Sequence, residues 1–316
     1  MRRLWILVLL VVVAALGAEV VMRWGRGDVV KKGVAATQRG GAELKILLSN
    51  IRIADAKDGV NQWPNRRALL VDIFKRRDAD VIGMQEVSPP QAAYLIKELP
   101  GYGHYPDGRE DGEGALAPLV TMVASLNLIM YKADRFEVVE SSAGPVQPVD
   151  AAADPRTTAF YSLVVLKDKR GELGETLVVD THLRHNVRVA TLDAMAINNR
   201  ITAVRRTRPG VRVVLMGDMN WDRNSAVYGG LIGAADSFGV STPRTELRDT
   251  YDYAAKGKTE RWGSWHNFTG QAMAVWPSDL VLVSEEWAGT GPAEIVREHA
   301  GVVWPSDHFL VSVVLW

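Results

Sequence analysis

Polar residues stand at the ends of short apolar runs, and this repeated arrangement constrains the fold more than any other feature of the sequence. Each run has the length of a β-strand and is rich in Val, Ile and Leu. The residues at the run ends are Asn50, Glu86, Thr181 with His182, Asp218 with Asn220, and Asp307 with His308, and Asp279 opens one further run. Because strand ends on one edge of a sheet converge, residues far apart in the sequence can share one cleft.

Helical patterns alternate with these strands. Apolar residues recur at helical spacing over 64–77 and 189–207, and Pro89-Pro90 opens a third helix that reaches about residue 99. The predicted strands cover 44–48, 80–86, 126–131, 160–166, 176–181, 211–216, 279–284 and 309–316. Many strands with few helices predict an α/β (α+β) fold of stacked sheets with helices outside, and not a doubly wound sheet.

The residue types at the strand ends indicate a hard cation. Carboxylate and amide oxygens, in a chain without cysteine, are ligands that magnesium and manganese prefer, and Glu86 and Asn50 can supply such oxygens. Asp279 together with Asp307-His308 predicts an aspartate–histidine pair, in which the acid fixes the imidazole tautomer and supports its positive charge. An attacking water would then need Asp218 to orient it or to accept its proton.

Composition excludes several classes of protein. The chain has 316 residues, 47% hydrophobic and 23% charged, which excludes a disordered chain, a coiled coil and a collagen. There is no cysteine, which excludes disulfides, thiolate metal sites, a cysteine nucleophile and a lipoprotein cysteine. Its 37 basic residues balance 37 acidic ones, so the bulk charge gives no sign of the basic face that proteins use to grip long duplex DNA.

The first segment is expected to be a targeting segment and not part of the folded domain. Met1 and two arginines precede the uncharged apolar run 4–18, which is the pattern of a secretory signal. Continued through residue 22, the run approaches the about 20 residues of a membrane span. Residues 1–27 are therefore predicted to be a signal peptide or an N-terminal membrane anchor, and the protein to be exported, either secreted or held in the cell envelope through residues 4–22. Residues 28–42 are predicted to be a linker, and 43–316 one folded domain.

Five segments, in order along the chain, resemble the signatures of the endonuclease/exonuclease/phosphatase superfamily, whose fold is shared with pancreatic deoxyribonuclease I. The segments are Leu47-Leu48-Ser49-Asn50-Ile51-Arg52, Asp80-Val81-Ile82-Gly83-Met84-Gln85-Glu86, Val179-Asp180-Thr181-His182-Leu183, Met216-Gly217-Asp218-Met219-Asn220 and Ser306-Asp307-His308-Phe309-Leu310-Val311. They resemble the family's asparagine motif, Gln-Glu strand, Thr-His-Leu, Gly-Asp-Phe-Asn and Ser-Asp-His. Residues 278–284 stand where the family has Ile-Asp-Tyr-Ile-Phe-Val-Ser. The resemblance covers 43–316.

The resemblance implies both a fold and a reaction. The fold would be a four-layer sandwich of two mixed β-sheets packed face to face, with helices on both outer sides. The reaction would be metal-dependent hydrolysis of a phosphoric ester, with Mg²⁺ (or Mn²⁺) polarising a phosphoryl oxygen. The implied catalytic residues are His308, Asp218, Asn220, His182 and Asp279. The implied metal residues are Glu86, Asn50 and Asp307, the last either as a ligand or beside one.

Several side chains have more than one interpretation. Arg156 precedes a strand, as an arginine does in the family, so it would touch phosphate or pair with an acid, and His266 is predicted to contact substrate at the rim of the site. The spacing of His182 and His185 would suit zinc, but no third ligand has matching spacing. The tryptophans of segment 262–276 would stack on bases or sugars, or pack in the core. Arg66-Arg67 and Arg205-Arg206-Arg208 are predicted to be solvated helix faces.

The sequence leaves the substrate open, because superfamily members cleave DNA, RNA, inositol phosphates and sphingomyelin with one catalytic set. The predicted function is an exported or membrane-anchored, divalent-metal-dependent phosphoric-ester hydrolase of the phosphodiesterase or nuclease kind. Its partner would be a nucleic acid, a phospholipid or a small phosphodiester, with no obligate protein partner. Two alternatives stand beside it: a sphingomyelinase-like lipid phosphodiesterase, and a catalytically silent binding module. A silent module would be expected to have lost one of Glu86, Asp218, Asn220, Asp279 or His308, so the complete set favours an enzyme.

Overall fold

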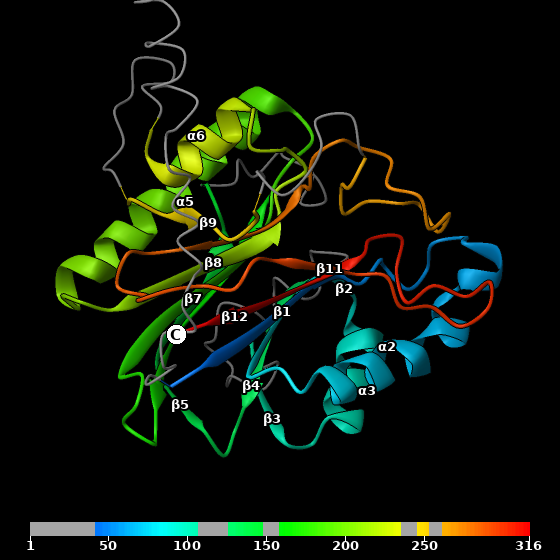
Figure 1. Ribbon diagram of the computed structural model, residues 1–316, viewed down its shortest axis with the longest axis horizontal. Coiled ribbons are helices and arrows are strands. Elements are labelled where there is room, and N and C mark those ends of the chain that lie inside the picture. The colour runs from blue at the N-terminus through cyan, green and yellow to red at the C-terminus, as the bar shows by residue number, and fades with distance from the viewer. Residues whose placement is uncertain (1–41, 107–125, 148–157, 235–244, 253–260) are drawn as a thin grey trace, which may run out of the picture. The chain divides into compact units, whose positions relative to one another are not determined.

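The computed structural model describes residues 42–106, 126–147, 158–234, 245–252 and 261–316, all within one compact unit that covers Gly41–Trp316 (Figure 1). The predicted signal or anchor segment, nearly all of the predicted linker, and Arg156 lie outside the described residues. Their boundaries and roles stay predictions. Among the described residues, no helix is long and apolar enough to cross a membrane.

Two six-stranded mixed sheets form the core of this unit. The first has the strand order β11-β12-β1-β2-β4-β3 and the second the order β5-β6-β7-β8-β10-β9. The strands of the first sheet are β1 (Leu44–Asn50), β2 (Val81–Val87), β3 (Tyr102–Tyr105), β4 (Leu126–Lys132), β11 (Glu294–Val296) and β12 (Leu310–Leu315). Those of the second are β5 (Phe136–Pro145), β6 (Phe160–Asp168), β7 (Glu175–His182), β8 (Arg212–Asp218), β9 (Arg248–Asp249) and β10 (Asp279–Val283).

Each sheet contains one parallel pair of strands joined by a helix. In the first sheet, β1 and β2 are parallel and are connected through the 3₁₀ turn η1 (Gly59–Asn61) and α2 (Trp63–Arg77). In the second, β7 and β8 are parallel and are connected through α5 (Val187–Thr207). The remaining neighbours pair antiparallel. A crossover helix is what a parallel connection requires, and it brings the carboxyl ends of both strands to the same edge.

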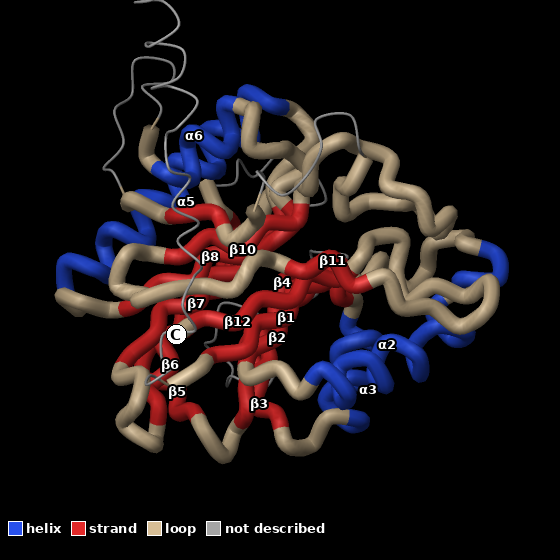
Figure 2. The backbone as a smooth tube through the Cα atoms, viewed as in Figure 1, coloured by secondary structure: helices blue, strands red, loops and turns tan. Residues whose placement is uncertain are grey.

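The side chains of β1 alternate between two hydrophobic clusters, as the two-residue period of a strand requires. Leu44, Ile46 and Leu48 face the second sheet, whereas Leu47 faces α2 and α3 (Pro89–Glu98). The opposite face of the second sheet packs against α5 and α6 (Ala226–Ile232). Figures 1 and 2 show the two sheets between these two pairs of helices. This arrangement confirms the predicted four-layer sandwich.

The predicted long strands and the three predicted helices are all present, with ends shifted by at most two residues. The sequence reading missed β3, β5, β9, β11, α6 and η1. Two of these strands have only two or three residues, and β5 has a register shift between Val138 and Glu140 that breaks the alternation of its side chains. No periodic pattern was therefore available to reveal them.

Candidate active site

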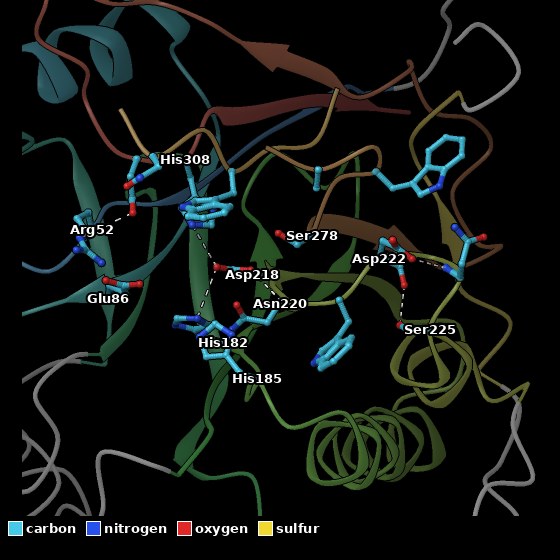
Figure 3. A pocket seen from close by; sticks show the side chains of 17 residues that line it. Arg52, Glu86, His182, His185, Asp218, Asn220, Asp222, Ser225, Ser278 and His308 are labelled. Atoms are coloured by element: carbon cyan, nitrogen blue, oxygen red, sulfur yellow. Dashed lines mark hydrogen bonds and ion pairs between the residues drawn. The ribbon is translucent and has the colours of Figure 1, made fainter. Parts of the chain in front are cut away.

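One cleft of about 800 Å³ collects the residues at the strand ends (Figure 3). Six of the predicted site residues line it, namely Glu86, His182, Asp218, Asn220, Asp307 and His308. Asn50 and Asp279 are buried and join the site through hydrogen bonds to residues that line the cleft. The residues come from both sheets and from the segment before β12, so the packing of the two sheets assembles the site.

A bulge in β2 turns Glu86 into this cleft. Along β2 the side chains alternate until Gln85, which faces the second sheet and donates from Nε2 to Asp180 Oδ1 (2.5 Å). Strict alternation would then point Glu86 toward α2 and α3. Instead, Glu86 has φ +60° and the pairing with β4 shifts between Met84 and Val87. A bulge that re-aims one side chain is common beside active sites.

Gly217 allows Asp218 to lie beside His182. These two strand-end residues face each other in the parallel register of β7 and β8, as Gly217 faces Thr181. Gly217 has φ +153°, and a Cβ at this position would lie 1.9 Å from the carbonyl oxygen of Thr181. Only glycine fits so close an approach, which explains physically why a glycine precedes the aspartate in this segment.

Asp218 stands at the centre of the site. Its Oδ2 accepts a hydrogen bond from Asn50 Nδ2 (3.0 Å) and lies 3.6 Å from His182 Nε2 and 3.7 Å from His308 Nε2. Burial opposes the charged form, but the charges of His308 and His182 hold the pKa of Asp218 below its usual value. Asp218 is therefore an ionised carboxylate enclosed by donors.

His308 is held between two aspartates, as the predicted aspartate–histidine pair requires. Its Nδ1 lies 2.8 Å from Asp279 Oδ2, while its Nε2 faces Asp218. Burial would lower the pKa of His308, but the charges of Asp279 and Asp218 outweigh burial and raise this pKa to about 10. The ring is thus an imidazolium at neutral pH, and it offers positive charge to an anion in the cleft.

Glu86 and Asp307 supply two carboxylates to the same end of the cleft. Arg52 Nε lies 3.8 Å from Asp307 Oδ2, and the same guanidinium pairs with Asp58 at 3.2 Å. Burial raises the pKa of Asp307, and the charge of Glu86 raises it further. The charge of Glu86 disfavours the charged form of Asp307, and a divalent cation beside these two oxygen donors in an open cleft would relieve this.

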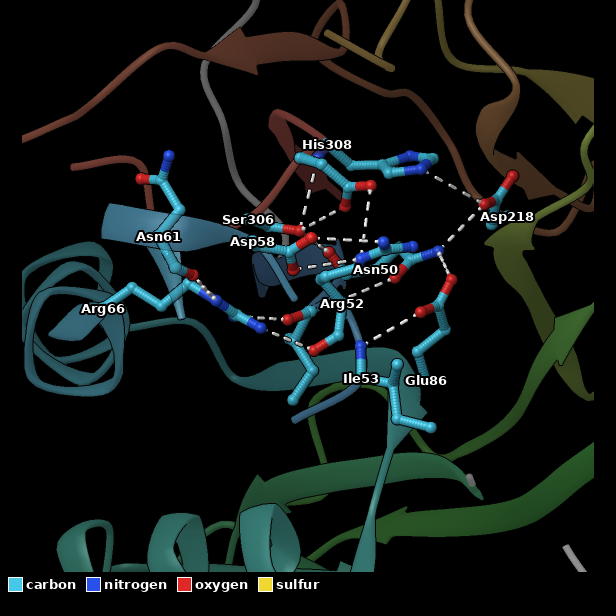
Figure 4. Close-up of polar contacts among 12 residues, drawn as sticks. Asn50, Arg52, Ile53, Asp58, Asn61, Arg66, Glu86, Asp218, Ser306 and His308 are labelled. Carbon is cyan, nitrogen blue, oxygen red and sulfur yellow. Dashed lines mark hydrogen bonds and ion pairs between the residues drawn. The ribbon is translucent and has the colours of Figure 1, made fainter. Parts of the chain in front are cut away.

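Asn50 links Glu86 to Asp218 of the second sheet. Its Nδ2 donates to Glu86 Oε1 and to Asp218 Oδ2, both at 3.0 Å, while its Oδ1 accepts from the backbone N–H of Arg52 (Figure 4). In this geometry Asn50 positions the acids on either side of it. Its predicted role as an oxygen ligand of the metal stays a prediction.

Asp218, Asp279 and His308 form a second group whose ligand atoms lie close enough to hold an ion. However, the proton on His308 Nδ1 already joins that ring to Asp279. The imidazolium therefore supplies positive charge at this point, which disfavours a cation bound there.

Arg66 is not where the sequence predicted it to be. It is 0% exposed, so the predicted solvated face is wrong for this residue, whereas Arg67 is exposed as predicted. Its guanidinium donates to the carbonyl oxygens of Ile51 (2.6 Å), Arg52 (2.7 Å), Asn61 (2.9 Å) and Pro305 (3.0 Å) (Figure 4). It therefore ties the segment after Asn50 to the segment before Asp307. Burial lowers the pKa of Arg66 to about 10, so it stays charged at neutral pH.

His266 does not contact the cleft, which contradicts the predicted substrate contact. The ring is fully buried and stacks on Phe309 with centroids 4.0 Å apart, and burial lowers its pKa to about 3. Its backbone N–H donates to the carbonyl of Asp307 (2.9 Å). His266 thus supports the segment that carries Asp307 and His308. No signal in the sequence predicts this burial, because a core histidine and a rim histidine look alike in a motif.

The structure also shows the surroundings of the other residues singled out in the sequence. Asn220 has φ +56°, its backbone N–H donates to Asp218 Oδ1, and its Nδ2 donates to the carbonyl of Leu183. Asn127 Nδ2 donates to the carbonyl of Phe160. His185 is exposed and lines the cleft, as do Trp265 and Trp276, whereas Trp262 is buried.

A DNase I-like sandwich with acid and histidine residues gathered at its strand ends defines the class of this protein. A sequence profile of the endonuclease/exonuclease/phosphatase family matches residues 49–308. The chain therefore belongs to this family, whose members hydrolyse phosphoric esters, and the resemblance seen in the sequence is confirmed. No curated protein matches the chain in sequence.

Solved structures of the family share the fold. A mannosyl-6-phosphatase of Bacteroides thetaiotaomicron has a TM-score of 0.70 at 22% identity, over 86% of this chain and 99% of that one. An endonuclease/exonuclease/phosphatase family protein of the same organism has a TM-score of 0.68 at 22% identity, over 87% and 95%. Truncated TDP2 of Caenorhabditis elegans has a TM-score of 0.61 at 18% identity, over 87% and 98%.

Proposed function

We propose that this protein is a divalent-metal-dependent phosphoric-ester hydrolase. The observation that carries the proposal is the cluster around Asp218, in which one ionised carboxylate oxygen is shared by Asn50, His182 and His308. Such a cluster places a base and two imidazoles around one point in an open cleft. That is the arrangement needed to activate a water and to neutralise the phosphoryl group that it attacks.

The residues that would hold the cation are Glu86 and Asp307, with Asn50 beside them. Mg²⁺ suits these oxygen donors, and Mn²⁺ is the alternative. A cation bound there would polarise a phosphoryl oxygen and stabilise the leaving oxygen.

The residues of the chain have separable tasks. Asp218 orients the attacking water and takes its proton, because this carboxylate stays ionised between the two imidazoles. His308 and His182 donate to phosphoryl oxygens, and Asn220, whose backbone N–H bonds Asp218, completes this side of the site. Asp279 keeps the Nδ1 proton of His308 in place, which directs Nε2 toward the cleft.

The test is a panel of phosphate esters offered to the full-length protein with Mg²⁺, with Mn²⁺ or with EDTA. The panel contains plasmid DNA, single-stranded RNA, sphingomyelin, an inositol polyphosphate, a chromogenic diester and mannose 6-phosphate. Mannose 6-phosphate is included in the panel because one structurally similar protein is named a mannosyl-6-phosphatase. Metal-dependent cleavage that disappears in His308→Ala is the expected result. Cleavage that persists in EDTA or in His308→Ala would contradict the proposal, and no cleavage at all would favour the silent binding module.

We also propose that the protein is exported and either secreted or anchored through residues 4–22. The support is the double arginine followed by an uncharged apolar run. Cell fractionation, with the N-terminal sequence of the recovered protein, tests this. A chain that starts after residue 17 indicates a cleaved signal, and an intact chain in the membrane fraction indicates an anchor. An intact chain confined to the soluble cytosolic fraction would refute export.

A further inference from the structure

The cleft is larger than the chemistry at phosphorus requires. Its volume of about 800 Å³ lies in the range of about 300–1,000 Å³ that is typical of pockets enclosing a whole small molecule. In Figure 3, Asp222 and Ser225 lie on the side of Ser278 away from Arg52 and Glu86. The cleft therefore has a reacting end and a second end that the proposed mechanism does not use.

Three tryptophans line the cleft, Trp221, Trp265 and Trp276, and we call them the aromatic rim. Each lies next to a residue of the site. Trp221 follows Asn220 directly, and Trp276 precedes Ser278 by two residues. Trp265 pairs antiparallel with His308, so both side chains leave the backbone on the same face. The rim is thus built onto the same segments that carry the catalytic groups.

Two indoles of the aromatic rim, those of Trp221 and Trp276, are held in place, and all three remain accessible. Trp221 Nε1 donates to the carbonyl of Arg184 (2.9 Å). Trp276 packs edge-on against the buried Trp262, with centroids 5.7 Å apart. Trp265 is 40% exposed, and the other two rim residues are half-buried. Rigid aromatic faces of this kind bind a flat partner at small cost in conformational entropy.

Few basic side chains are found among the described residues that line the cleft, and this does not favour a chain of phosphates. Among the described residues that line it, Arg52 is the one lysine or arginine, and it is paired with Asp58. At the second end, Asp222 contributes a carboxylate to the described part of the lining. Proteins that bind a nucleic-acid strand follow its backbone with basic side chains. A second phosphate in this cleft would meet Asp222 instead.

We infer that the aromatic rim binds the group carried by the phosphate, and that the substrate has a single phosphate on an uncharged ring. This inference rests on the proposed function. A sugar ring and a nucleobase share the required chemistry, a neutral face that stacks on an indole. The rim therefore determines the class of substrate, while the catalytic residues determine only that a phosphoric ester is cleaved.

The test measures equilibrium binding by calorimetry, so that it does not depend on turnover. The full-length protein carrying His308→Ala, which prevents turnover, is titrated in Mg²⁺ with mannose 6-phosphate, adenosine 5′-monophosphate, glycerol 3-phosphate and adenosine 5′-diphosphate. We expect at least one ring-bearing monophosphate to bind roughly tenfold tighter than acyclic glycerol 3-phosphate. The tighter of the two identifies the ring. The diphosphate is expected to bind more weakly than the monophosphate.

Variants assign the effect to the aromatic rim. Trp265→Ala and Trp221→Ala should each reduce the preference for the ring by about tenfold. The matched control is Trp316→Phe, because Trp316 follows Leu315, which pairs with Leu44 at the end of β1 opposite Asn50. The control should keep the preference.

Three outcomes would overturn the inference: equal affinity for the ring-bearing and acyclic ligands, a preference that survives both rim variants, or tighter binding of the diphosphate. Failure of the proposed function gives a different result. If rings bind tightly but no ester is hydrolysed, the role of the aromatic rim is supported and only the proposed hydrolase activity is refuted.

Discussion

The two ends of the cleft are built differently. At the reacting end, Asn50, Asp218 and Asp279 are buried, and every one of them is hydrogen-bonded to another residue of the site. At the second end, which carries the aromatic rim, Trp265 is exposed and Asp222 is half-buried. The first region is fixed by a polar network that joins two sheets, whereas the second consists of side chains on loops.

This difference follows from what each region has to do. Stabilising charge at phosphorus depends on donors that are already in place, because reorganising them during the reaction would cost the energy they are meant to supply. Recognising a ring needs only accessible faces. Changes at the reacting end should therefore affect turnover, metal binding or folding, while changes at the rim should affect which ligand binds.

The largest effect is expected from His308→Ala. Removing the imidazolium between Asp279 and Asp218 should lower kcat by about 10²–10³-fold or more. Steady-state kinetics on the ester that the panel identifies gives the value. His299→Ala is the control, because that ring is exposed, stacks on Trp304 and does not line the cleft. Equal losses in the two variants would mean that His308 has no special part in the reaction.

Arg66→Met should cost the most stability. It leaves the carbonyls of Ile51, Asn61 and Pro305 without the guanidinium that bonds them, and each buried unpaired group costs about 1–3 kcal/mol. We expect a loss of about 3 kcal/mol or more in the free energy of unfolding, measured with urea.

Arg67→Met is the matched control for this change. Arg67 is the neighbouring residue, exposed and packed over the ring of Tyr94, so its loss should stay within about 0.5 kcal/mol. Arg66→Lys should recover only part of the stability, since an ammonium cannot reach all four carbonyls. If the methionine variants at 66 and 67 unfold at the same urea concentration, Arg66 does not hold the two segments together.

Glu86→Gln should raise the Mg²⁺ concentration needed for half-maximal activity by roughly tenfold or more, because it removes one of the two charges at the predicted cation site. The measurement is an activity titration with Mg²⁺, carried to saturation. Glu298→Gln serves as control, since Glu298 pairs with Arg76 and Arg77 away from the cleft. A titration curve identical to that of the wild type would remove Glu86 from the metal site.

The smallest effect is expected behind the site, at Asp180. Burial raises the pKa of Asp180 well above its usual value, although the hydrogen bond from Gln85 opposes this. Between the unfolded pKa of about 3.9 and the higher folded pKa, the folded state keeps a proton that the unfolded state has lost. The wild type therefore loses stability as pH rises through this window.

Asp180→Asn removes this titration. The stability of the variant relative to the wild type should grow with pH above about 4, by about 1.4 kcal/mol for each unit by which the two pKa values differ. Urea unfolding at pH 5, 6, 7 and 8 measures it. A difference that does not change with pH would show that Asp180 does not take up a proton on folding.

Much of the fold was readable from the sequence because its long elements are strongly periodic. β1, β2, β7 and β8 are apolar runs that end in polar residues, and α2 and α5 show helical spacing. The residues at the reacting end of the cleft could be predicted from the same pattern, since the ends of these strands carry Glu86, His182 and Asp218. The short strands β9 and β11 could not be predicted, because two or three residues paired to a sheet edge have no pattern of their own.

The sequence by itself determined the family, the strands and the chemical groups at their ends, because period, motif and residue type are local properties. Only the tertiary structure decided where Arg66 and His266 lie. One looked like a solvated helix residue and the other like a rim histidine, yet both are buried. Burial depends on which segments meet in space, and here η1, α2, the segment around His266 and the segment before β12 meet beside the strand end that carries Asn50. The contacts between these segments bring Asp307 close to the strand end that carries Asn50, and no single stretch of the chain determines this arrangement.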